Sequence, residues 1–82
     1  MKFLFDKNGI EAVNIYEVKK ICIEKIFDEN WEETKYFRVT AEISFEDEGI
    51  ILEEFKSEDR DKNFSDAKKY LADLVKILNG ED

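Results

Sequence analysis

The chain contains no histidine and no proline, and it has glycine at only three of its 82 positions. Histidine is the commonest general base and zinc ligand, so its absence removes the histidine-based catalytic triads and most zinc sites. The glycines, at positions 9, 49 and 80, are too far apart to form a glycine-rich phosphate-binding loop. We therefore expect a protein that is not an enzyme and that holds no cofactor or metal.

Cysteine is almost absent as well. Cys22 is the only one, so no disulfide can form within the chain. It lies in a stretch predicted to be a strand, and no histidine is present to activate its thiol. A buried structural cysteine is favoured over a nucleophile.

Long apolar runs are also missing. The opening run, Phe3–Phe5, is followed directly by Asp6. A signal peptide needs an apolar run of about 7–15 residues, and a membrane-spanning helix needs about 20. We expect a cytoplasmic protein with no membrane partner.

What the sequence does contain is charge and aromatic residues. Charged residues make up 41% of the chain and hydrophobic residues 43%, with 7 Phe, 3 Tyr and 1 Trp. Disordered chains lack this many large apolar side chains, so the composition predicts a folded protein, with residues 1–82 forming a single domain. The net charge of −8 argues against direct binding to nucleic acid, which requires basic patches.

Strand patterns dominate the first two thirds of the chain. The clearest is Tyr36–Phe45, where apolar and polar residues alternate strictly, with Phe37, Val39, Ala41, Ile43 and Phe45 on one face. Asn8-Gly9 is a two-residue hairpin signal, and a single helical turn is expected between 14 and 18. The other predicted strands are Lys2–Phe5, Ile10–Val13, Lys19–Phe27 and Ile50–Phe55.

The last third predicts one helix. Apolar residues recur there at steps of three and four, which makes an apolar stripe. The helix is expected to begin at a cap formed by Ser65 or Asn63, or earlier at Ser57, and to end at Asn79-Gly80. The stripe consists of Phe64, Ala67, Leu71, Leu74, Val75 and Leu78.

These elements predict an α+β fold, in which one C-terminal amphipathic helix packs on one face of an antiparallel sheet of three to five strands. The helix covers only one face, so apolar residues on the other face are either scattered surface residues or a surface for self-association. We assign Cys22, Ile26 and Tyr36 to that open face, together with Ile50 and Leu52.

Two local features have part of the pattern of a binding site. Residues 59–65 place acidic or amide residues at the first, third and fifth positions of a calcium loop, but Phe64 and Tyr70 occupy its two decisive positions, so a polar loop is favoured. Trp31 lies in a polar stretch between two strands. It is interpreted as a lid over the sheet edge, with an interface anchor as the alternative.

The acidic charge is unevenly distributed. Residues 1–41 carry 8 acids and 7 bases, whereas residues 42–82 carry 13 acids and 6 bases. A solvated, decorative hairpin is the simpler interpretation of the densest stretch. A rigid acidic strip could instead be attracted to a basic groove, with Trp31 or Tyr36 as an aromatic anchor. The strip consists of Glu42, Glu46, Asp47, Glu48, Glu53 and Glu54.

The chain resembles small uncharacterised proteins of Gram-positive bacteria and their phages. The resemblance lies in Lys2–Phe5 with Asn8-Gly9, in Val18–Glu24 and in the amphipathic C-terminal helix. In size and acidity it is also similar to phage inhibitors of host defence, including anti-CRISPR proteins. The resemblance implies no site residues. It implies a small acidic protein that inhibits or modulates a basic protein partner, such as a nucleic-acid-binding defence protein. The alternative is a structural domain that forms a homodimer through its open sheet face.

Overall fold

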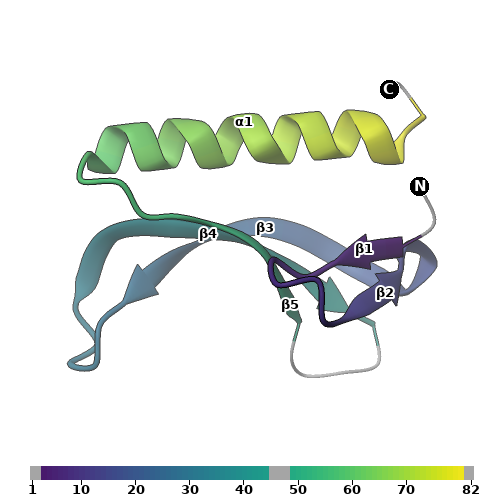
Figure 1. Cartoon of the computed structure of the whole chain (residues 1–82), viewed down its shortest axis with the longest axis horizontal. Helices are drawn as coiled ribbons and strands as arrows, with labels where there is room; N and C mark the ends of the chain where they lie inside the picture. Colours follow the sequence, from purple (N-terminus) through teal and green to yellow (C-terminus); the bar gives the residue numbers. More distant parts are fainter. Residues whose placement is uncertain (1–2, 45–48, 81–82) are drawn as a thin grey trace.

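The computed structural model describes residues 3–44 and 49–80. It has the α+β fold that the sequence predicts, with two antiparallel sheets and one long helix (Figure 1). The larger sheet has the order β3-β4-β5, and the helix α1 lies across one face of it. No helix in this part of the chain is long and apolar enough to cross a membrane. The elements are β1 (Phe3–Phe5), β2 (Ala12–Asn14), the 3₁₀ turn η1 (Ile15–Glu17), β3 (Val18–Phe27), β4 (Glu33–Ile43), β5 (Ile50–Phe55) and α1 (Arg60–Leu78).

The small hairpin of β1 and β2 forms as predicted, but its turn is longer than two residues. Gly9 has a positive φ of 69°, whereas a type I′ turn at Asn8-Gly9 would need positive φ at both residues, and Asn8 does not have it. The side chain of Asp6 organises the turn instead, because its Oδ1 accepts hydrogen bonds from the N–H groups of Ile10 and Glu11 (2.8 and 3.3 Å). The helical turn expected at 14–18 is present as η1, capped by Asn14.

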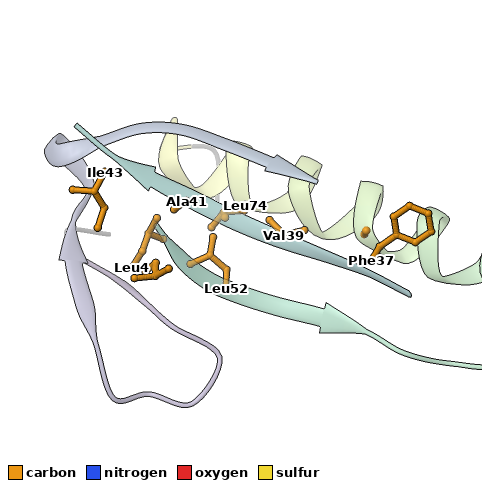
Figure 2. Close-up of a cluster of buried hydrophobic side chains, with 9 residues drawn as sticks. Leu4, Phe37, Val39, Ala41, Ile43, Leu52 and Leu74 are labelled. Atoms are coloured by element: carbon orange, nitrogen blue, oxygen red, sulfur yellow. The ribbon is translucent and has the colours of Figure 1, made fainter. Parts of the chain in front are cut away.

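The central strand β4 confirms the alternation read from the sequence. Phe37, Val39, Ala41 and Ile43 are all buried and face α1, whereas Phe45 lies outside the described residues. Both neighbours of β4 are antiparallel, and its core side chains are enclosed between the sheet and the helix (Figure 2).

Strand β5 corrects the assignment of Ile50 and Leu52 to the open face. Both are buried in the core, at 5% and 4% exposure. The register between β4 and β5 shifts by one residue beside Leu52, which is the signature of a β-bulge. The bulge lets Leu52 and Phe55 both pack against the core although they are three residues apart, and the alternation pattern could not show this.

Helix α1 begins earlier than the caps proposed at Asn63 and Ser65, and later than the one at Ser57. Asp59 is the N-cap, and its carboxylate accepts hydrogen bonds from the N–H groups of Asp61 and Lys62. The predicted end at Asn79-Gly80 is confirmed, since Gly80 adopts φ 80° and its N–H donates to the carbonyl of Ile77 (3.0 Å).

The buried face of α1 is rotated slightly from the predicted stripe. Ala67 and Leu74 are fully buried, but Phe64 and Val75 are more than 40% exposed. Tyr70 lies on the inner side instead, with its ring 5.9 Å from that of Phe55. A stripe read at steps of three and four cannot distinguish its two flanks, and the sheet beneath decides which flank is covered.

Candidate protein-binding turn

The connection between β3 and β4 is a tight turn held by four hydrogen bonds. The Trp31 N–H donates to the Asp28 carbonyl (3.0 Å), and the Asp28 N–H donates to the Glu32 carbonyl (2.9 Å). The Asp28 side chain adds two further bonds, because Oδ1 accepts from the N–H groups of Asn30 (2.8 Å) and Glu32 (3.0 Å). One aspartate therefore fixes the backbone of the turn at both ends.

Trp31 occupies a position in this turn that usually belongs to glycine. Three-residue hairpin loops place the residue after the β-turn in the left-handed region, and Trp31 has φ 62°, the only positive φ of a non-glycine residue within 3–44 and 49–80. A left-handed conformation costs an L-residue roughly 1–2 kcal/mol. The bulky indole is thus held in a conformation that destabilises the turn.

The indole side chain is exposed and does not cover the sheet. Trp31 is 84% exposed, so the interpretation of this residue as a lid over the sheet edge is wrong. At this exposure the indole gains little burial to offset the cost of its left-handed backbone conformation. An exposed, strained tryptophan on a rigid turn has the geometry of an interface anchor.

Acidic side chains surround Trp31. Residues 28–33 contain four acids and no base. Glu33 is already used, because the Lys25 ammonium donates to it (2.9 Å) and thereby lowers the pKa of the Glu33 carboxyl. Glu29 and Glu32 are exposed, and neither takes part in an ion pair with the described part of the chain. These two carboxylates remain available to a basic partner.

The acidic strip of residues 42–54 is only partly described. Glu42 lies 3.6 Å from the Lys20 ammonium, and Glu54 is ion-paired with Lys7, which lowers the pKa of the Glu54 carboxyl. Glu53 is the cross-strand partner of the core residue Val39, so it lies on the helix side of the sheet. The structure therefore does not bring these three acids to one face. Glu46, Asp47 and Glu48 lie outside the described residues.

The open face of the sheet mixes apolar and charged side chains. Cys22, Ile26 and Tyr36 are half-buried there, and the Cys22 sulfur lies 3.6 Å from the Thr40 hydroxyl. A charged row runs beside them, in which the Glu24 carboxylate accepts a hydrogen bond from Thr40 (2.7 Å) and lies 3.7 Å from the Arg38 Nε. Apolar and charged side chains therefore share this face.

The segment tested as a calcium loop has a structural role. Asp59 and Asp61 lie at the start of α1, where Asp59 is the N-cap and the positive end of the helix dipole favours acidic residues. Across residues 3–44 and 49–80, no three cysteine or acidic side chains are arranged to hold a metal ion.

Sequence reasoning missed the special conformation of Trp31. The available signal was the spacing, because three residues (29–31) separate Asp28 from Glu32 between two alternating segments, and such loops place their last residue in the left-handed region. Comparisons of the chain with models of known protein families, with curated proteins and with solved structures found no match.

Proposed function

We propose that the chain is a non-enzymatic binding protein that docks on a basic surface of another protein, with Trp31 as the anchor. The observation that carries this proposal is the strained and exposed indole on the β3–β4 turn. Tryptophan is among the residues most enriched in interface hot spots, and here it is presented without any role in the core.

Rigidity adds to the case for an anchor. The turn is held by four hydrogen bonds, two of them to the Asp28 carboxylate, so the backbone that carries Trp31 is ordered before binding. An ordered backbone loses little conformational entropy on association, which raises affinity without adding contacts. Glu29 and Glu32 flank the anchor and favour a basic partner.

The acidity of the whole chain supports the same partner class. A net charge of −8 attracts a basic surface at long range and accelerates encounter, especially at low salt. An inhibitor of this kind would act by occupying a basic groove that normally holds nucleic acid, with Trp31 and the acids Glu29 and Glu32 of the β3–β4 turn in contact with it.

A displayed library of random dodecapeptides tests the proposal without knowledge of the partner. The library is selected on the wild-type protein and depleted on Trp31→Gly. We expect the surviving peptides to be rich in Lys and Arg, to lose about tenfold or more in affinity for Trp31→Gly, and to bind more weakly as salt rises. Survivors without basic residues, or no peptide that depends on Trp31, would overturn the proposal.

Matched variants distinguish a contact through the β3–β4 turn from the effect of losing any exposed aromatic residue or of changing the net charge. Tyr16→Ala is the aromatic control, because Tyr16 is 86% exposed and lies elsewhere. Reversing Glu29 and Glu32 to Lys is compared with reversing Glu11 and Glu17, which are also exposed and change the net charge equally.

Only the turn variants should weaken binding strongly. Equal losses from the two pairs would mean that overall charge, and not the turn, attracts the peptide. A loss confined to a variant with residues 46–48 reversed to Lys would move the contact to the acidic strip.

A further inference from the structure

The two edge strands of the larger sheet, β3 and β5, differ in whether another element covers them. The outer edge of β5 is partly covered by the β1–β2 hairpin, because the Lys7 N–H donates to the Ile51 carbonyl (2.8 Å). Strand β3 is the other edge, and within residues 3–44 and 49–80 its only hydrogen-bonded neighbour is β4. A ten-residue edge strand offers a row of backbone donors and acceptors to a further strand.

The regular part of this edge is short and bounded. Register shifts between Val18 and Lys20 and between Lys25 and Phe27 leave Lys20–Lys25 as the evenly paired run. Irregularities at both ends limit regular backbone pairing with an added strand to this window. The first five residues of the run, Lys20–Glu24, are centred on Cys22.

We propose that a second copy of the chain pairs with this edge, antiparallel and about a twofold axis at Cys22. The first argument is charge. Lys20 and Glu24 both lie on the open face, next to Glu42 and Arg38 respectively. The axis sets Lys20 of each copy opposite Glu24 of the other, so two opposite-charge pairs form.

The Glu24 carboxylate and the Lys20 ammonium can each form a second ion pair. The contacts of Glu24 with Thr40 and Arg38 are made through Oε1, which leaves Oε2 for the new lysine. The Lys20 ammonium is 3.6 Å from Glu42, and its side chain is 58% exposed. Lys25 would approach the other copy's Lys19, but Glu33 already compensates the charge of Lys25.

The second argument is shape on the helix face. An apolar groove of about 370 Å³ lies where the start of β3 meets the C-terminal part of α1, lined among others by Ile15, Val18, Val75 and Leu78. At the opposite end of β3, Phe27 is 46% exposed. Its cross-strand partner Glu33 is ion-paired with Lys25, and the cross-strand partner of Lys25 is the core residue Phe37, which places this pair on the helix face.

The same twofold axis joins these two features. Beyond the regularly paired window, the same axis places Phe27 of one copy near Glu17 and Val18 of the other, at the mouth of the groove. Each copy would thus seat one phenylalanine in the groove of its partner, and Ile21 would face Ile23 beside it. The product is a continuous six-stranded sheet with both helices on one face and the two Trp31 turns at opposite ends.

Sedimentation equilibrium from micromolar to near-millimolar protein tests the proposal. We expect a monomer–dimer equilibrium for the wild-type chain. Lys20→Glu and Glu24→Lys should each weaken association by about tenfold or more, because two attractive pairs become repulsive. The double swap Lys20→Glu/Glu24→Lys should restore association to within about threefold of wild type. Circular dichroism of each variant confirms that the monomer is folded.

Control substitutions and a cysteine cross-link show whether the interface is the β3 edge. Swapping the charges of Lys62 and Asp66, an ion pair on α1, should not change association. Phe27→Ala should weaken the dimer, whereas Phe5→Ala, at a phenylalanine that is 62% exposed, should not. Oxidation with copper–phenanthroline should join the two Cys22 thiols, since cross-strand Cα distances suit a disulfide.

A chain that stays monomeric near millimolar concentration would overturn the proposal and assign the edge lysines to keeping strands apart. A dimer whose association is unchanged by Lys20→Glu or Glu24→Lys, and that forms no Cys22 cross-link, would show that the two copies meet at a surface other than the β3 edge. This inference does not depend on the proposed function, because its readouts require no basic partner.

Discussion

The side chain of Asn63 makes more hydrogen bonds than any other in the described structure. It is 1% exposed, and its amide makes four hydrogen bonds. Nδ2 donates to the carbonyls of Lys35 (2.8 Å) and Ser57 (3.0 Å), while Oδ1 accepts from the Ser57 N–H (2.9 Å) and hydroxyl (2.7 Å). The residue therefore ties β4, the β5–α1 loop and the helix together, with every donor and acceptor of its amide satisfied.

Asn63→Asp should destabilise the fold by about 2–4 kcal/mol, because it replaces two donors with an oxygen that faces two carbonyls in a buried site. Urea unfolding measures the change. Asn8→Asp, at an exposed turn position, is the matched control and should cost less than about half a kcal/mol. Similar losses at both positions would mean that the buried network contributes nothing specific.

The role of Asn63 also marks a limit of sequence reasoning at the residue scale. In the sequence it was a candidate N-cap, because asparagine before an apolar stripe often caps a helix. Asp59, four residues earlier, is the cap instead. A short polar side chain suits either role, and only the position of β4 beside the helix decides between them.

At the scale of elements, α1 is held to the sheet by few side chains. Leu74→Ala should cost about 2–5 kcal/mol, since Leu74 is buried against the sheet. Leu71 is half-buried and should lose less, while Ile77→Ala, on the exposed side of the same helix, should lose less still. Urea unfolding of the three variants should rank them in this order. A loss below about half a kcal/mol at Leu74 would contradict docking of α1 on the sheet.

The type and order of the elements could be predicted, because strict alternation at 36–45 and helical spacing at 64–78 are strong signals. The faces of β5 could not. Alternation assigns Leu52 and Phe55 to opposite faces, and only the bulge in the register with β4 brings both into the core. A bulge depends on the partner strand, so one strand's sequence does not contain it.

At the scale of the whole molecule, the structure favours a different acidic segment from the one that the sequence favours. Acidic residues are densest at 42–54, but two of the three acids described there are ion-paired. Lys7 and Lys20 lie far from these acids along the chain and near them in the fold. Charge counts along a sequence cannot include such neutralisation. For Trp31 the sequence favoured a lid over the sheet edge, with an interface anchor as the alternative, and only the 84% exposure of the side chain decides against the lid.

The central claim is that Trp31 serves recognition and not stability. The most direct test is the unfolding free energy of Trp31→Gly in urea. Glycine adopts φ 62° freely, although its greater flexibility when unfolded offsets part of this gain. The variant should therefore be as stable as the wild type, or more stable by up to about 1 kcal/mol. A loss above about 2 kcal/mol would show that the indole packs as part of the fold, and would contradict the claim.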